Sequence, residues 1–144
     1  GALNLNARNF EVELRRAREK LKNGMSGFLT QPVLSAQAVE NLRRTREELG
    51  SEAKILAGIM PVVSQRNAVF MENEINGIHV EAWITEHFAG LDRAQGEELG
   101  LEISMQMARA ALPYADGFYL MTPFNRVALM ERLIGRLKEE VIKD

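Results

Sequence analysis

The sequence predicts a parallel α/β fold, in which strands alternate with helices along the chain. Three apolar segments are each followed by a region with helical spacing or a helix-capping residue, and they cover residues 27–33, 54–63 and 116–124. The middle segment is continuously apolar, which is typical of a strand that is covered on both faces and usually parallel. Right-handed crossovers join such strands by default, so a parallel sheet with intervening helices is the simplest architecture.

The first part of the chain predicts the end of a strand and then a helix. The opening residues 1–7, GALNLNA, resemble a strand tail, because an apolar start runs directly into asparagines. From residue 9 to residue 23, apolar side chains recur at the spacing of an amphipathic helix, and they are Phe10, Leu14, Ala17 and Leu21. Gly24 follows at the position where glycine commonly ends a helix.

The middle of the chain contains two helices whose beginnings are marked by serine. Ser35 is a good N-cap for a helix that ends at Gly50, and Ser64 caps a helix that ends at the turn dipeptide Asn76-Gly77. The strand of residues 27–33 precedes the first of these helices, and the strand of residues 54–63 precedes the second. This order repeats the strand–helix unit.

The last part of the chain predicts three further helices and one strand. Residues 80–91 form a short helix, and Asp92 caps a long helix that ends near Ala111, because Pro113 prevents its continuation. After the strand of residues 116–124, apolar residues at Val127, Met130 and through to Val141 predict a final amphipathic helix.

Composition favours a single soluble globular unit over residues 1–144. The chain is 46% hydrophobic and 26% charged, and its formal net charge of -2 offers no electrostatic reason to bind nucleic acid. It has no cysteine, which excludes disulfides and thiolate metal sites. No apolar run is long enough for a membrane span, and the N-terminus lacks the order of a signal peptide, so we expect a cytoplasmic protein that does not bind membranes.

Polar residues follow each predicted strand, and the carboxyl ends of parallel strands form the usual ligand crevice. They are Asn4, Asn6, Thr30, Gln31, Ser64, Gln65, Arg66, Asn67, Thr122, Asn125 and Arg126. Amides, hydroxyls and arginines suit a hydrogen-bonding heterocycle or a phosphate better than a metal ion, and no metal-ligand motif surrounds either histidine. Polar residues are also common at strand ends without any function, and Asn125 could simply cap the last helix.

Three ordered segments resemble the methylenetetrahydrofolate reductase family. They are LRRAREKLKNGMSGFLTQPV, AGIMPVVSQRNAVFMENEINGI and YADGFYLMTPFNR. The resemblance covers essentially the whole chain, and FLTQPV, RNAVFMENEINGI and MTPFNR are most similar to the bacterial bifunctional version, in which a homocysteine S-methyltransferase precedes the reductase. The family acts in one-carbon metabolism and methionine biosynthesis.

The resemblance implies the C-terminal part of a (β/α)8 barrel, from the tail of strand five to strand and helix eight. Members of the family carry FAD and pass a hydride from NAD(P)H through the flavin to 5,10-methylenetetrahydrofolate, forming 5-methyltetrahydrofolate. The acidic catalytic residues of the family lie on earlier strands. The resemblance therefore implies no catalytic residue in this chain, and we expect it to be inactive by itself.

The resemblance also implies individual binding residues. For the folate substrate, Gln31 matches a glutamine that hydrogen-bonds the pterin, Arg126 matches an arginine after strand eight, and the loop after strand seven supplies Asn67 with either Phe70 or Met71. For the cofactor, Lys20 matches a contact to the FAD phosphates, with Arg16 as a neighbouring cation because Glu19 replaces a basic position. Asn4 and Asn6 correspond to flavin contacts after strand five.

Two further expectations concern partners. A non-catalytic α/β module that binds a metabolite or a partner domain remains the alternative, since this chain lacks both acidic residues. A barrel needs about 250 residues, so a chain of 144 residues leaves sheet edges and an inner face open. We therefore expect a homo-oligomer.

Overall fold

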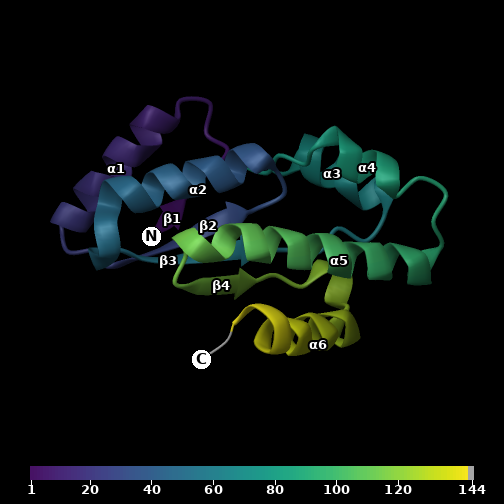
Figure 1. The fold of residues 1–144 in the computed structure, drawn as a ribbon. Helices are drawn as coiled ribbons and strands as arrows, with labels where there is room; N and C mark the ends of the chain where they lie inside the picture. Colours follow the sequence, from purple (N-terminus) through teal and green to yellow (C-terminus); the bar gives the residue numbers. More distant parts are fainter. Residues whose placement is uncertain (143–144) are drawn as a thin grey trace.

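The computed structural model describes residues 1–142 and contains one four-stranded parallel sheet. Its strands are β1 (Ala2–Leu3), β2 (Gly27–Pro32), β3 (Lys54–Ile59) and β4 (Gly117–Leu120), and they are neighbours in this same order (Figure 1). The predicted alternation of parallel strands and helices is therefore confirmed.

Six α-helices accompany the sheet in the part of the chain that the structure describes. They are α1 (Phe10–Lys22), α2 (Ala36–Leu49), α3 (Gln65–Glu74), α4 (Ala82–His87), α5 (Arg93–Ala111) and α6 (Val127–Arg136). The predicted caps are confirmed, because the side chains of Ser35, Ser64 and Asp92 each accept a hydrogen bond from a backbone N–H in the first turn of the helix that follows.

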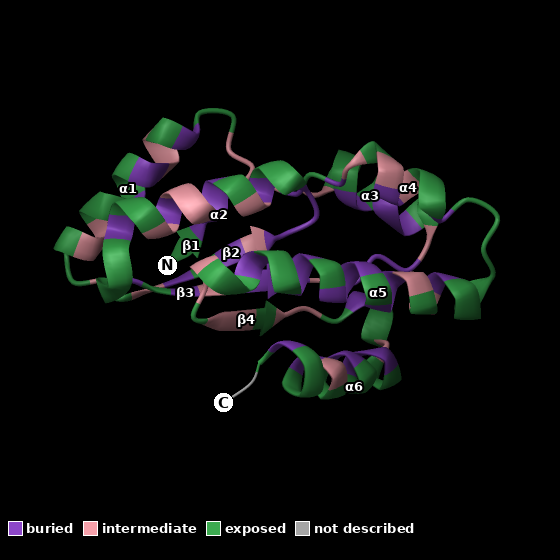
Figure 2. Ribbon diagram, viewed as in Figure 1, coloured by how far each residue is buried: buried purple, intermediate pink, exposed green. Residues whose placement is uncertain are grey.

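The helices that link consecutive strands cover one face of the sheet. Because neighbouring strands are consecutive in the chain and crossovers are right-handed, α1, α2 and α5 fall on the same side. Contacts run from α1 to α2, from α2 to α5 and from α5 to α6. The core lies under these helices and contains Leu3, Phe28, Ile55, Ala57, Leu42, Met105 and Leu133, each 1% exposed or less (Figure 2).

Among residues 1–142, no helix lies over the opposite face of the sheet. Residues that pair across the strands there are Ala2 with Leu29, Leu29 with Leu56, and Gly58 with Tyr119. Leu29 and Tyr119 are each 41% exposed, and Leu56 is partly buried. We call Ala2, Leu29, Leu56 and Tyr119 the open face. The expectation that the apolar strand is covered on both sides is thus wrong for this chain, because helices cover only one side.

Three predicted boundaries differ from the structure. β3 stops at Ile59, although the apolar run continues to Val63, because Pro61 has no N–H to pair with a neighbouring strand. β4 spans only Gly117–Leu120, and Pro123–Asn125 forms a 3₁₀ turn instead of the strand's end. The last helix is regular to Arg136 and then widens into a π-turn at Leu137–Val141.

Helix α5 approaches the segment after β3 very closely. A Cβ atom added at Gly96 would lie 2.2 Å from the carbonyl oxygen of Val63, and one at Gly100 would lie 2.1 Å from that of Val62. Only glycine allows this contact, which fixes the chain just before Ser64. Within residues 1–142, none of the helices combines the length and apolar character needed to cross a membrane.

Candidate functional site

A β-bulge in β2 presents Gln31 at the carboxyl end of the sheet. The register between β2 and β3 shifts between Leu29 and Pro32. The hydroxyl of Thr30 takes over the ladder position there: it accepts a hydrogen bond from Gly58 N at 2.8 Å and donates to Gln31 O at 2.8 Å. Bulges commonly redirect a side chain beside a site. Gln31 is partly exposed, and its side-chain amide makes no hydrogen bond within residues 1–142.

Three amides gather around one turn at this end of the sheet. A Cβ atom at Gly77 would lie 3.4 Å from the side chains of both Asn4 and Gln31, and the positive φ of +85° at Gly77 makes the turn possible. Asn6 Nδ2 donates to Gly77 O at 2.9 Å, and Asn4 Oδ1 accepts from Asn6 N at 2.9 Å. We call Asn4, Asn6, Gln31 and Gly77 the amide cluster.

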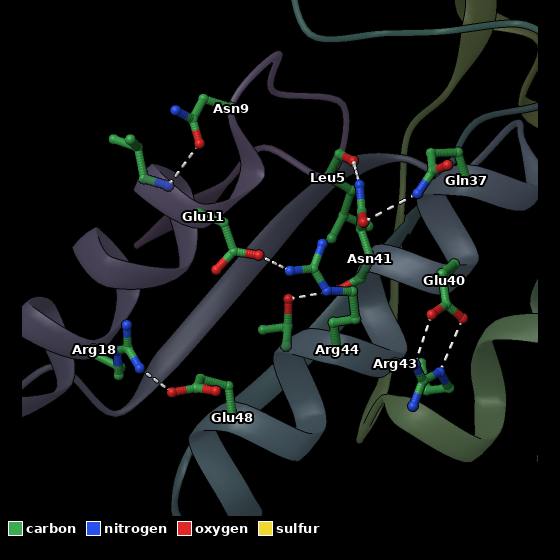
Figure 3. A network of polar contacts seen from close by, with 12 residues as sticks. Leu5, Asn9, Glu11, Arg18, Gln37, Glu40, Asn41, Arg43, Arg44 and Glu48 are labelled. Atoms are coloured by element: carbon green, nitrogen blue, oxygen red, sulfur yellow. Dashed lines mark hydrogen bonds and ion pairs between the residues drawn. The ribbon is translucent and has the colours of Figure 1, made fainter.

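The loop that carries Asn4 and Asn6 is anchored on α2. Asn41 is 4% exposed and donates from Nδ2 to the carbonyl oxygen of Leu5 at 2.8 Å (Figure 3). Asn41 Oδ1 in turn accepts a hydrogen bond from Gln37 Nε2 at 3.2 Å. A buried amide with satisfied partners fixes the position of the loop, so α2 holds the amide cluster in place.

A second group of residues lines a hollow of about 380 Å³ between the β3 and β4 ends. We call it the aromatic hollow, and its lining residues are Ser64, Arg66, Asn67, Phe70, Phe124 and Arg126. The sequence predicted three of them as substrate contacts, namely Asn67, Phe70 and Arg126, and the structure brings these three together. None of the lining residues carries a carboxylate.

Helix α3 forms one wall of the aromatic hollow, and it carries both residues that the sequence offered as the apolar substrate contact, Phe70 and Met71. Phe70 is 50% exposed, whereas Met71 is completely buried in the core. Of these two, only Phe70 is placed to touch a ligand. Asn67 also has a local role, because its Oδ1 accepts a hydrogen bond from Val63 N at 3.1 Å and its N–H donates to Ser64 Oγ at 3.0 Å.

Arg126 and Phe124 form the other wall. Arg126 Nη1 lies 2.7 Å from Glu97 Oε1 on α5, and both side chains are mostly buried. Phe124 is 67% exposed, and φ is positive at Phe124 (+48°) and at Asn125 (+57°). The sequence did not predict Phe124 as a site residue, because it was included in a strand. The Pro-Phe-Asn order is a turn signal that could have revealed it.

The two cations predicted for the flavin phosphates lie elsewhere. Arg16 and Lys20 line a hollow of about 530 Å³ at the end of α1, together with Glu19, Asn23, Gly24 and Met25. Lys20 Nζ donates to Ala2 O at 3.2 Å. This basic hollow shares no lining residue with the aromatic hollow, so the structure separates Lys20 and Arg16 from the predicted substrate contacts.

Within residues 1–142, the residues predicted for the flavin fit a phosphate only in part. Glu19 opposes the charge of Arg16 and Lys20, and the C-terminal end of a helix carries partial negative charge, which disfavours a phosphate. Asn4 and Asn6 are engaged in the hydrogen bonds that hold the turn at Gly77. Arg16 and Lys20 therefore have the charge that a phosphate needs, but their surroundings do not favour one.

The sequence matches one family model over almost its whole length. The matching model describes methylenetetrahydrofolate reductase, and the match covers residues 2–138. The chain belongs to the methylenetetrahydrofolate reductase family. This membership confirms the resemblance of the three ordered sequence segments to the family. No curated protein is detectably similar in sequence.

A solved structure is similar to this methylenetetrahydrofolate reductase family member in fold. It is described as an uncharacterized protein from Clostridium thermocellum that binds two copies of 5-methyl-5,6,7,8-tetrahydrofolic acid. The TM-score is 0.62 and the sequences are 18% identical. The similarity covers 96% of this chain and 50% of the other, so the chain spans about half the length of that structure.

Proposed function

We propose that this chain supplies the folate-binding part of a methylenetetrahydrofolate reductase barrel, with strands β1 to β4 in the places of barrel strands five to eight. In the complete enzyme, FAD would carry a hydride from NAD(P)H to 5,10-methylenetetrahydrofolate. Family membership over residues 2–138 supports this proposal, and so does a sheet with consecutive strand order and helices on one face. The alternation of such strands and helices is the repeating unit of the barrel.

The observation that carries the proposal is the unpaired amide of Gln31 at the carboxyl end of β2. An amide has one acceptor and two donor hydrogens, so it can bind the edge of a heterocycle that offers both types of group. The bulge at Thr30 sets the backbone position of Gln31, and the hydrogen bonds of Asn6 and Asn41 hold the loop beside it. A donor–acceptor pair at this position suits the pterin of a folate.

The decisive experiment measures binding of 5-methyltetrahydrofolate to Gln31→Ala by isothermal titration calorimetry. We expect the variant to lose about 1 to 3 kcal/mol of binding free energy, because two hydrogen bonds to the pterin are removed. Gln106→Ala is the matched control, since Gln106 is exposed on α5 and far along the chain from the amide cluster. Equal affinity for the wild type and Gln31→Ala would refute the assignment.

The remaining details of this proposal come from the resemblance alone. We propose that the complete protein is cytoplasmic and of the bifunctional type, with a homocysteine S-methyltransferase before the reductase. We also propose that Lys20 and Arg16 contact the FAD phosphates only when the rest of the barrel is present. A flavin titration of this chain should therefore show weak binding or none.

A non-catalytic binding module is the second candidate, and one observation favours it. The aromatic hollow has no carboxylate among its lining residues, so it offers no general acid of that type. The genome distinguishes the two candidates. An uninterrupted reading frame that encodes four further strand–helix units before residue 1 supports the enzyme, whereas a start codon at residue 1 supports the module.

We further propose that the open face associates with a second copy when this chain is alone. β1 and β4 each leave one edge of the sheet unpaired in the described residues, and Leu29 and Tyr119 remain 41% exposed. Unpaired edges beside an apolar face favour association. A net charge of only -2 opposes it weakly.

A further inference from the structure

The chain contains two Asn-Gly dipeptides, and the fold places them in different surroundings. They are Asn23-Gly24 at the end of α1 and Asn76-Gly77 after α3. Asparagine is chemically labile, and it reacts fastest before glycine, because no side chain hinders attack by the glycine nitrogen on the asparagine amide carbon. A comparison of the two dipeptides therefore shows what the fold adds to this reactivity.

At the end of α1, hydrogen bonds hold both reacting groups. Gly24 N donates to Leu21 O at 3.2 Å. Asn23 Nδ2 donates to the carbonyl oxygen of Glu19 at 2.9 Å, and Asn23 N donates to the same oxygen at 3.0 Å. For reaction, Gly24 N must leave its acceptor and approach Cγ of Asn23. The hydrogen bonds of the helix end therefore oppose the attack.

After α3, the same two groups are free of such bonds. Asn76 is exposed, and within residues 1–142 neither its side-chain amide nor Gly77 N makes a hydrogen bond. A hydrogen bond from Ile78 N to Ile75 O closes the turn at 3.4 Å, which is long for this type of bond. Attack at this dipeptide therefore begins without breaking a hydrogen bond of either reacting group.

The fold also requires the glycine that makes Asn76 reactive. φ at Gly77 is +85°, and this residue occupies the third position of the turn formed by residues 75–78, where a positive φ favours glycine. An added Cβ atom would lie 3.4 Å from the side chains of Asn4 and Gln31. A larger residue that shielded Asn76 would therefore strain the turn beside the amide cluster.

The reaction needs only water as a co-reactant. Gly77 N attacks Cγ of Asn76, a bond forms between these atoms, the Cγ–Nδ2 bond breaks, and ammonia leaves with the proton of Gly77 N. Water then opens the cyclic succinimide at either of its carbonyl carbons. One opening leaves an aspartate at position 76, and the other leaves an isoaspartate, whose Cβ atom becomes part of the main chain.

The products would act on the amide cluster. Gly77 O accepts the hydrogen bond from Asn6 Nδ2 at 2.9 Å, and an extra main-chain atom just before Gly77 displaces this oxygen. We propose that Asn76-Gly77 is a self-modification site, and that deamidation there separates Gly77 from Asn6 and moves the turn that lies against Gln31. The resulting loss of folate affinity rests on the proposed function, whereas the modification itself does not.

The first experiment compares the two dipeptides in one sample. The full chain is kept in neutral buffer, and deamidation is followed by peptide mass spectrometry and by labelling with an isoaspartate-specific methyltransferase. Asn23 should react about tenfold more slowly than Asn76, because its hydrogen bonds must be broken first. This difference should disappear in concentrated urea. Equal rates in the folded chain, or the same ratio in urea, would refute the site.

The second experiment tests the contact with the amide cluster by NMR. In the deamidated chain, the side-chain amide signals of Asn6 should shift, while those of Asn67 at the end of β3 should not. Asn76→Ala is the control, because it has no amide to lose and the side chain it replaces is exposed. Its Asn6 signals should stay constant through the same incubation. Unchanged Asn6 signals in the deamidated wild type would show that the turn and the cluster are not coupled.

The third experiment separates this inference from the proposed function. Deamidated wild type should bind 5-methyltetrahydrofolate about tenfold more weakly than fresh protein, the size expected for one lost hydrogen bond, and incubated Asn76→Ala should keep its fresh affinity. If fresh protein does not bind this folate, the proposed function fails, while mass spectrometry and NMR still decide the modification. If binding survives deamidation unchanged, the effect on the ligand is wrong and the folate function stands.

Discussion

The two faces of the sheet differ although the same strands form both. On the helix-covered face, Phe28 and Ile55 are 1% exposed or less, while on the open face their neighbours Leu29 and Leu56 are exposed or only partly buried (Figure 2). Both faces are apolar. The difference therefore comes from what covers them and not from the kind of side chain they present.

This comparison indicates that the chain has one core of its own and an apolar surface that stays partly exposed on the open face. A sheet in which both faces are apolar is typical of α/β proteins that cover both sides or close into a barrel. The site residues lie at the carboxyl edge where the two faces meet. Stability should therefore depend on the covered face, and association on the open face.

The largest effect is expected where α5 contacts the segment after β3. In Gly100→Val, the added Cβ atom would lie 2.1 Å from the carbonyl oxygen of Val62, which is too close for two non-bonded atoms. This oxygen belongs to the backbone, so it cannot rotate aside as a side chain could. We expect the variant to lose more than about 4 kcal/mol of a free energy of unfolding that is typically about 5 to 15 kcal/mol, and so to unfold at a much lower urea concentration than the wild type. Urea denaturation followed by circular dichroism measures this.

Gly135→Ala is the matched control on α6. A Cβ atom at Gly135 meets no neighbour within 4 Å, so this variant should gain about 0.5 to 1 kcal/mol from helix propensity. A Gly100→Val protein that unfolds cooperatively at the wild-type urea concentration would contradict the close packing of α5.

The second prediction compares adjacent residues on the two faces. Phe28→Ala should lower the free energy of unfolding by about 3 to 5 kcal/mol, since Phe28 is 1% exposed in the core. Leu29→Ala should lower it by less than about 1.5 kcal/mol, because much of its surface is already in water. The measurement is urea denaturation at a concentration where both variants are monomeric. Similar losses would remove the distinction between the faces.

Local sequence signals predicted most of the fold. Ser35, Ser64 and Asp92 cap helices because their side chains act on the backbone within three residues. The periodicity of α1 and α6 was equally local. The end of β3 was not predicted, although Pro61 is a local signal for it, because the continuous apolar run was given more weight. The end of β4 was not predicted because strand length also depends on pairing with neighbours that are distant in sequence.

The site was predicted less completely, for a similar reason. The sequence predicted Gln31, Asn67 and Arg126 because each lies at or after the end of a strand. The topology of a parallel sheet brings these strand ends to one edge. The separation of Lys20 from these residues depends on the direction of α1. The exposure of Phe124 depends on a turn conformation that hydropathy does not encode, because a phenylalanine after an apolar strand is more often part of the core.

The third prediction concerns the amino-terminal end of β3 and β4. Burial raises the pKa of Asp116, but hydrogen bonds from Ile55 N at 2.8 Å and Arg46 Nη2 at 2.6 Å outweigh it, so this pKa lies below its ordinary value of 3.8. The carboxylate therefore stabilises the fold above pH 3.8, and this contribution is lost as the pH falls through the folded-state pKa.

Asp116→Ala should accordingly be less stable than the wild type by about 1 to 3 kcal/mol at pH 7, because Ile55 N loses its acceptor. The difference should shrink as the pH falls below 3.8. Thermal unfolding from pH 7 to pH 2 measures it, with Glu131→Ala as the control on an exposed part of α6. A constant difference across this range would exclude the ionised carboxylate as the cause.

The smallest effect on stability, and the clearest test of the open face, is expected from Leu29→Lys. Burying the exposed parts of Leu29 and Tyr119 in an interface contributes about 1 kcal/mol for each side chain, roughly half the value for full burial. Across two copies these contributions sum to about 4 kcal/mol, which only equals the low end of the cost of association, so a dimer also needs contacts from the unpaired strand edges. The hydrogen bond from Lys20 to Ala2 O, on the outer edge of β1, must also break if a strand pairs there.

We therefore expect a weak dimer that is populated only as the concentration approaches the millimolar range, and one charge on the open face is enough to dissociate it. Sedimentation velocity should show dimers for the wild type and monomers for Leu29→Lys, while the free energy of unfolding of the monomer changes by less than about 0.5 kcal/mol. Leu91→Lys is the control, because Leu91 is an exposed apolar residue in the loop before α5 and away from the sheet. A wild-type protein that stays monomeric, or a Leu91→Lys variant that dissociates equally, would show that exposed apolar area on the open face does not determine association.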